Sequence, residues 1–201
     1  MKIVNHRINN SDDLKKIDKK FGIEIDLRGY SDEVIVSHEP FDTSAENFEK
    51  WLLNYNHDLL ILNIKEEGIE EKVLKIMDKN NFSNFFLLDQ SFPYFIKYLK
   101  INNKITSIRF SEFESIETIK STVNRIGITP GWVWVDCFTG DWNHLSKLNE
   151  IKKLGIKTCL VSPELQGRDL LKEINKITEP DFHLDLDAVC TKFPENWQQY
   201  V

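Results

Sequence analysis

The chain has 201 residues, a formal net charge of -6 and 41% hydrophobic residues, which permits one domain with a sizeable core. The mild acidity and the absence of a Lys/Arg run argue against a nucleic-acid-binding protein. No apolar stretch approaches the roughly 20 residues of a membrane helix, and the N-terminus has no apolar core of a signal peptide. We therefore expect a cytoplasmic protein without a membrane span.

Short apolar runs alternate with amphipathic segments along the whole chain. Eight runs have the pattern of strands that are buried on both faces of a parallel sheet. They are 2–6, 23–29, 58–65, 84–90, 105–110, 131–138, 157–163 and 188–193. Helical patterns lie between them at 11–22, 42–56, 69–81, 92–100, 115–127, 142–155 and 167–177. One further run, 33–38, follows the second strand after a three-residue turn and predicts a hairpin.

Eight strands with interleaved helices predict a (β/α)8 TIM barrel that spans 1–201 as a single domain. The alternative fold is an open, doubly wound sheet. Such a sheet would have fewer strands, and no G-x-G-x-x-G follows the first predicted strand. In a barrel, the active site lies at the carboxyl ends of the strands, so the polar residues there are the candidates for chemistry.

Glu24 and Asp26 share one face of the second strand because strand side chains alternate with period two. Two carboxylates that point into a barrel repel each other unless positive charge lies between them. A divalent cation such as Mg²⁺ or Ca²⁺ would supply that charge. An ion pair with Arg7, Arg28 or Lys65 would also supply it, and the spacing alone leaves both possibilities open.

Two histidines are expected near the same end of the strands. His6 closes the first strand and His38 closes the hairpin, so the two imidazoles could act as a general base and a general acid. Arg7 and Lys65 could bind the oxygens of a phosphate. Among the other histidines, we expect His57 and His144 at the surface, and His183 is left unassigned.

Other residues have a structural interpretation. The three cysteines, Cys137, Cys159 and Cys190, lack metal-ligand spacing and are expected to be small buried side chains in a reducing compartment. Trp132 and Trp134 alternate on one strand face, where they fill the barrel or form a wall against the organic group of a substrate.

Four motifs together resemble a known family. They are His6-Arg7 at the end of the first strand, "EID" at 24–26, "VIVSHEP" with His38, and "LNIK" at 62–65. In this order and placement they resemble the glycerophosphodiester phosphodiesterases, which are phospholipase C-like phosphodiesterases with a TIM barrel. The segment "AVCTKFPENW" near the C-terminus is similar to the closing strand of that family.

The resemblance implies a metal-dependent phosphodiester hydrolase that acts on a small phosphodiester and needs a divalent cation, Mg²⁺ or Ca²⁺. It implies metal ligation by Glu24, Asp26 and Asn63, an acid/base pair of His6 and His38, and phosphate binding by Arg7 and Lys65. Asn63 stands where the family has a glutamate, Lys192 stands at the family's closing aspartate, and the segment 39–57 is too short for the family's usual insertion. Two alternatives are a degenerate barrel that binds a phosphorylated ligand and a lyase that forms a cyclic phosphate, as related barrels do.

Overall fold

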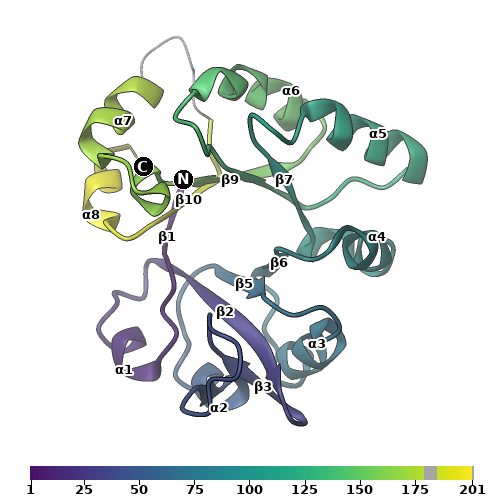
Figure 1. Cartoon of the computed structure of the whole chain (residues 1–201), viewed down its shortest axis with the longest axis vertical. Helices are drawn as coiled ribbons and strands as arrows, with labels where there is room; N and C mark the ends of the chain where they lie inside the picture. The colour runs from purple at the N-terminus through teal and green to yellow at the C-terminus, as the bar shows by residue number, and fades with distance from the viewer. Residues whose placement is uncertain (179–184, 201) are drawn as a thin grey trace.

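The computed structural model describes residues 1–178 and 185–200, which form a mixed α/β fold around one curled sheet (Figure 1). The eight predicted parallel strands are present. They are β1 (Lys2–Asn5), β2 (Gly22–Tyr30), β5 (Leu60–Ile64), β6 (Phe85–Leu88), β7 (Ser107–Phe110), β8 (Trp132–Val135), β9 (Lys157–Val161) and β10 (Ala188–Thr191). The predicted hairpin is confirmed as β3 (Glu33–Val36), which pairs antiparallel with β2. A short strand that we did not predict, β4 (Glu46–Asn47), extends it.

The first and last strands of the sheet are neighbours, because β1 pairs in parallel with both β2 and β10. The ladders continue from β2 through β5 to β6 on one side, and from β10 through β9 and β8 to β7 on the other. Between the described residues of β6 and the start of β7, only an isolated bridge from Leu87 to Thr106 is formed, beside a 2.6 Å hydrogen bond from Ser107 Oγ to the Leu87 carbonyl. The sheet thus curls as in a barrel, but no ladder among the described residues completes the ring.

Helices cover the outside of the curl (Figure 1). They are α1 (Ser11–Leu14), α2 (Phe48–Leu52), α3 (Glu70–Lys79), α4 (Phe92–Ile101), α5 (Ile116–Ile126), α6 (Leu148–Lys153), α7 (Leu170–Ile177) and α8 (Pro194–Trp197). Four 3₁₀ segments accompany them: η1 (Asn103–Ile105), η2 (Trp142–Lys147), η3 (Pro163–Gln166) and η4 (Gln198–Tyr200). No helix in the described part of the chain is long and apolar enough to cross a membrane.

Three predicted helices differ from the observed ones. The segment 42–56 forms only α2, because Glu46 and Asn47 pair with β3 as the strand β4. The segment 11–22 forms only the single turn α1, since Ser11 does not cap a longer helix but binds the Glu46 carboxylate through its amide and hydroxyl. The segment 142–155 is divided into η2 and α6, because Asp141 caps a 3₁₀ turn through the amide of Asn143. All three differences come from contacts with other parts of the chain, which helix periodicity does not report.

The inside of the curl is a separate apolar layer from the two layers under the helices. It contains Trp132 and Trp134, and the Trp132 ring stacks on Phe86 with centroids 4.6 Å apart. Both tryptophans are 5% exposed, so they fill the interior, as the more conservative interpretation of the sequence predicted. This packed layer supports the polar residues at the carboxyl ends of the strands.

Gly22 allows β2 to lie tightly against its neighbours at the start of the strand. A Cβ there would be 2.7 Å from the Leu59 carbonyl oxygen and 2.9 Å from Val4 Cγ2, both closer than real Cβ contacts. The glycine therefore fixes where β2 enters the sheet, two residues before Glu24.

Candidate active site

Three adjacent strands bring six of the seven predicted site residues together. β2 carries Glu24 and Asp26, β5 carries Asn63 with Lys65 just beyond it, and His6 and Arg7 follow β1. Asp26 pairs directly with Asn63 in the parallel register, so their side chains share one face of the sheet. The predicted common face of Glu24 and Asp26 is therefore present, and both side chains are fully buried.

The Glu24 carboxylate is held at both oxygens. Asn63 Nδ2 donates to Oε1 at 2.9 Å, and the backbone amide of Arg7 donates to Oε2 at 2.7 Å. Burial and the nearby Asp26 charge raise the pKa of Glu24 to about 7, against the opposing effect of these hydrogen bonds and Lys65. Without a bound cation, Glu24 therefore exchanges its proton near neutral pH.

Asp26 takes part in two ion pairs. Arg7 Nε lies 3.2 Å from Oδ2, and Lys65 Nζ lies 3.5 Å from Oδ1. Asn9 adds a reciprocal pair, since its amide donates to Oδ2 at 2.9 Å and its oxygen accepts from the Asp26 backbone amide at 3.0 Å. No motif or spacing in the sequence predicts this role of Asn9. Arg28, the third candidate cation, donates instead to the carbonyls of His38 and Lys65.

The backbone at Arg7 is left-handed, with φ at 57°. This conformation costs a residue with a Cβ about 1–2 kcal/mol. It is retained here because it directs the Arg7 amide to Glu24 and the guanidinium to Asp26. Strain of this kind is concentrated at functional sites, so the turn after β1 supports the importance of the His6-Arg7 pair.

His6 lies beside the carboxylates, with Nε2 3.8 Å from Glu24 Oε2. Burial, with the positive charge of Arg7, Lys192 and Lys65, lowers the pKa of His6 to about 4, although Asp26 acts in the opposite direction. The imidazole is therefore neutral at pH 7 and free to accept a proton.

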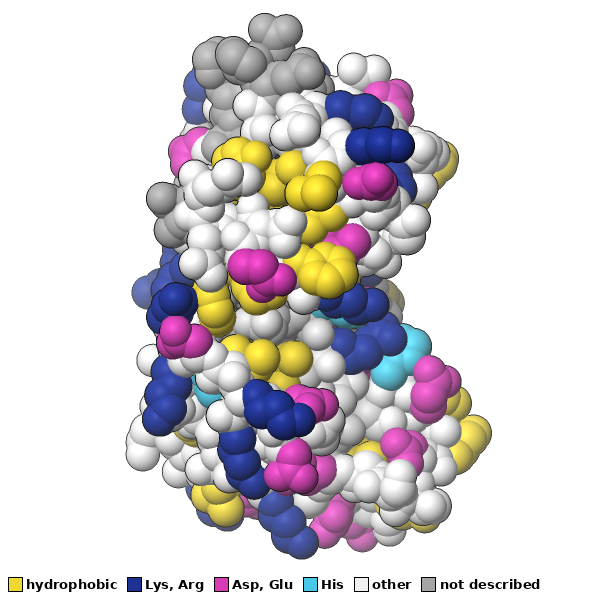
Figure 2. Space-filling view, turned by 90° about the vertical axis from the view of Figure 1, so that its left-hand side faces the viewer, with side chains coloured by type: hydrophobic (Ala, Val, Ile, Leu, Met, Phe, Trp, Pro, Cys, Tyr) yellow, Lys and Arg dark blue, Asp and Glu magenta, His cyan; other side chains and the backbone are white. Residues whose placement is uncertain are grey.

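His38 lies apart from this group. Its Nδ1 is 2.6 Å from Glu39 Oε1, and its side chain is 38% exposed. It lines an open cavity of about 460 Å³ that Asn9 also lines, so the Asp26 partner Asn9 links His38 to the buried cluster. Figure 2 shows dark blue Lys and Arg side chains and cyan His side chains gathered beside a hollow at mid-height on one face.

The cluster suits a hard divalent cation. Asp26 Oδ1 and Asn63 Oδ1 are buried and have no hydrogen-bond partner among the described residues. With Glu24 they make a set of oxygen donors on one face, which is the chemistry that Mg²⁺ and Ca²⁺ prefer. The donors therefore fit such an ion, with Asn63 supplying a neutral oxygen in place of a charged one.

A chain of charged residues continues from this site across the ends of the strands. Lys65 Nζ lies 3.4 Å from Asp89, whose other oxygen accepts from Arg109 at 2.6 and 2.9 Å. Arg109 also donates to Asp136 at 2.9 Å, and Gln166 donates to the second Asp136 oxygen at 2.7 Å. Asp89 thus pairs with Lys65 and Arg109, and it does not supply the carboxylate that is missing at position 63.

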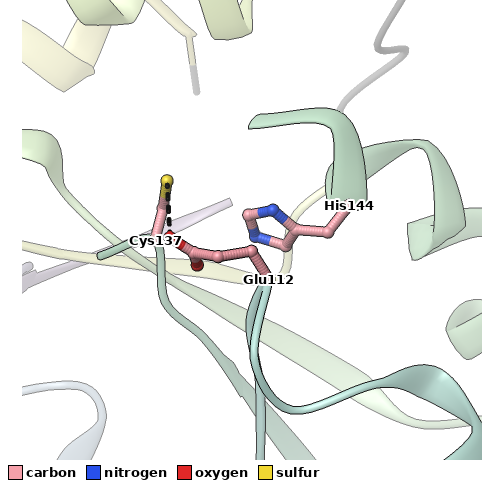
Figure 3. Close-up of side chains that lie close together, drawn as sticks. All are labelled: Glu112, Cys137 and His144. Carbon is pink, nitrogen blue, oxygen red and sulfur yellow. Dashed lines mark hydrogen bonds between the residues drawn. The ribbon is translucent and has the colours of Figure 1, made fainter. Parts of the chain in front are cut away.

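The remaining histidines are placed as follows. His57 is partly buried and its Nε2 contacts the Ile17 carbonyl at 3.2 Å. His144 is also partly buried and packs beside Glu112 and Cys137, so neither histidine is the surface residue that we expected (Figure 3). All three cysteines are buried and unpaired, as expected. His183 lies outside the described residues.

No family model matches the chain, and no curated protein matches it. Solved structures do. A candidate glycerophosphoryl diester phosphodiesterase from Agrobacterium tumefaciens str. C58 matches with a TM-score of 0.68 and 11% identity, over 98% of this chain and 95% of that one. A glycerophosphodiester phosphodiesterase from the same strain matches with a TM-score of 0.66 and 13% identity, over 97% and 98%. The chain therefore has the fold of the glycerophosphodiester phosphodiesterases, and the resemblance inferred from its motifs is confirmed at the level of the fold.

Proposed function

We propose that this protein is a metal-dependent phosphodiester hydrolase that acts on a small phosphodiester, with its eight strands working as a TIM barrel in a single cytoplasmic domain. One observation carries the proposal. Two buried carboxylates of β2, an amide oxygen, two cations and a neutral imidazole meet beside the ends of β1 and β5. The likeness to the two phosphodiesterase structures supports it.

The proposed roles follow from the positions of the side chains. Glu24, Asp26 and Asn63 would hold Mg²⁺ or Ca²⁺. When bound, the cation would offset the charge that develops on the phosphoryl oxygens. Arg7 and Lys65 would exchange their ion pairs with Asp26 for ion pairs with those phosphoryl oxygens, because a phosphate is an equivalent anionic partner.

The proton transfers would fall to the two histidines. Neutral His6 would accept a proton from the attacking water. His38, oriented by Glu39 and exposed at the adjacent cavity, would deliver a proton to the leaving oxygen. For this mechanism, a substrate bound in the cavity must place its phosphorus within reach of both His38 and the buried cluster.

The test is hydrolysis of bis(p-nitrophenyl) phosphate and of glycerophosphodiesters with added Mg²⁺, Ca²⁺ or Mn²⁺. We expect cation-dependent turnover that His6→Ala and His38→Ala each remove. Absence of turnover with every cation, or turnover that both substitutions leave intact, would contradict the proposal.

A second candidate is a barrel that binds a phosphorylated ligand without cleaving it. The ion pairs of the site favour this candidate, because Arg7 and Lys65 already neutralise the charge of Asp26 without a metal ion. Glycerol phosphate would then raise the unfolding temperature with or without a divalent cation, and no phosphodiester would be hydrolysed.

A further inference from the structure

A second group of metal-ligand side chains lies at the ends of β7 and β8. Glu112 follows β7, and Cys137 and His144 lie on the chain that leaves β8. Each residue offers one ligand atom, and the three atoms lie within 4.8 Å of one another. Figure 3 shows the side chains close together, with the outer edge of the His144 ring turned toward Glu112.

The His144 ring is prepared as a ligand. Its Nδ1 lies 3.2 Å from the Asp141 carbonyl, to which it can only donate. That bond puts the proton on Nδ1 and leaves the lone pair on Nε2, as in metal-bound histidines, whose other ring N–H donates to a carbonyl or carboxylate. Nε2 is buried and has no hydrogen-bond partner among the described residues.

The ring is also held in place by its neighbours. Phe110 meets it edge-on with centroids 5.3 Å apart, and Trp142 lies on its other side at 6.3 Å. Phe110 and Trp142 are both buried. Rotation of His144 away from Glu112 would therefore disturb packed aromatic side chains.

Glu112 and Cys137 complete the set. The Glu112 oxygen Oε1 accepts from the Thr139 amide, whereas Oε2 is buried without a partner in the described chain. The Cys137 thiol is fully buried, 4.0 Å from Glu112 Oε1 and 3.5 Å from the Asp141 carbonyl. Two of the three ligand side chains thus carry a buried atom that the described residues do not satisfy, which proteins rarely tolerate without a partner.

We propose that Glu112, Cys137 and His144 form a zinc-binding site that is separate from the Glu24 and Asp26 cluster. A sulfur, an imidazole nitrogen and a carboxylate oxygen are all ligands of Zn²⁺, whereas Mg²⁺ and Ca²⁺ select oxygen alone. Zinc ligands at about 2.0–2.3 Å lie about 3.3–3.8 Å apart, so the side chains need to close by about 1.5 Å or less. On binding, the metal replaces the thiol proton, which passes to solvent.

Three protein ligands leave one tetrahedral position open. A water would take it, because the Asp141 carbonyl accepts from Nδ1 of the His144 ring, on the side away from Nε2. The site would join the loop after β7 to the loop after β8, and it lies next in sequence to Asp136 of the charged chain.

Cobalt is the probe that separates the two metal sites. Co²⁺ bound to a thiolate has a charge-transfer absorption in the near ultraviolet, which an oxygen-only site does not produce. We expect this band to saturate at one Co²⁺ per chain and to disappear when Zn²⁺ is added. Cys137→Ser should abolish it, whereas the matched control Cys159→Ala should retain it, because Cys159 lies in the apolar interior layer.

Glu112→Gln keeps the shape of the side chain and removes its charge, so it serves if Cys137→Ser does not fold. We expect it to weaken Co²⁺ binding by about 10–100-fold, and Zn²⁺ to raise the unfolding temperature of the wild type more than that of the variant. Absence of the band in the folded wild type, its retention in Cys137→Ser, or unchanged affinity in Glu112→Gln would overturn the proposal.

Discussion

Asn63 Nδ2 donates a 2.9 Å hydrogen bond to Glu24 Oε1, and its own Oδ1 is buried without a partner in the described structure. The amide therefore does two things at once. It stabilises the buried Glu24 carboxylate in place of a cation, and it keeps one oxygen available for a cation. This pair determines how strongly the site depends on metal.

Asn63→Glu should make the site more dependent on metal. A third buried carboxylate removes the hydrogen bond to Glu24 and adds like charge, which we expect to lower the free energy of unfolding by about 1–3 kcal/mol in metal-free buffer. Added Mn²⁺ should restore that loss and bind about tenfold more tightly than to the wild type.

Asn63→Gln is the matched control, because it has the length of glutamate without the charge. It should show the loss of stability from misfit but no gain in Mn²⁺ affinity. Equal Mn²⁺ binding by both variants, measured by titration calorimetry, would show that position 63 does not contact the ion.

The pH dependence of stability reports on His6 and Glu24. The pKa of His6 falls from 6.5 to about 4 on folding, so below pH 6.5 protons favour the unfolded chain and stability decreases. The pKa of Glu24 rises from 4.5 to about 7, so between pH 7 and 4.5 protons favour the folded chain. The two effects oppose each other, so the contributions of His6 and Glu24 largely cancel in the wild type.

Glu24→Gln should expose the His6 effect. Between pH 7 and pH 5, urea unfolding of the metal-free variant should show roughly 2 kcal/mol more loss of stability than the wild type. Adding His6→Gln to this variant should remove the extra loss. A wild type and a Glu24→Gln variant with the same pH profile would contradict the assignment.

His6→Gln should lower kcat by about 10²–10⁴-fold if His6 carries a proton in the reaction. The variant should keep its affinity for Mn²⁺, because the imidazole is 3.8 Å from Glu24 and is not among the oxygen donors. His57→Gln is the control, since His57 contacts only a backbone carbonyl by its ring nitrogen and should keep full activity. Equal kcat for the two variants would exclude a catalytic role for His6.

Arg109 is predicted to stabilise the ends of the strands. Arg109→Leu leaves the buried Asp136 and the half-buried Asp89 without their shared cation, which should cost about 3–5 kcal/mol. The exposed Arg125→Leu should change stability by less than about 0.5 kcal/mol. Adding Asp136→Asn to Arg109→Leu should recover part of the loss in chemical denaturation, and no recovery would contradict the pairing.

Much of the fold could be predicted because each parallel strand is a short apolar run. The count of eight such runs does not depend on where the helices begin and end. Period two in β2 also placed Glu24 and Asp26 on one face. The absence of a ladder between the described residues of β6 and β7 could not be predicted. It depends on how far the sheet curls, and the residue pattern of either strand does not report this.

The site was predictable where strands carry it and not where loops do. Glu24, Asp26, Asn63 and Lys65 follow from strand register. Asn9 reaches Asp26 only because the chain turns at Arg7 with positive φ. The Glu112, Cys137 and His144 group spans two loops, and its spacing in sequence resembles no metal motif.

We propose that one cation at Glu24, Asp26 and Asn63 drives phosphodiester hydrolysis. The most direct test of this proposal is the rate of glycerophosphodiester hydrolysis as a function of Mg²⁺ concentration, for the wild type and for Asp26→Asn. We predict saturable activation of the wild type, and in Asp26→Asn a loss of activity or a shift to at least about tenfold higher Mg²⁺. Activity that is independent of Mg²⁺, or a Mg²⁺ curve that Asp26→Asn leaves unchanged, would contradict it.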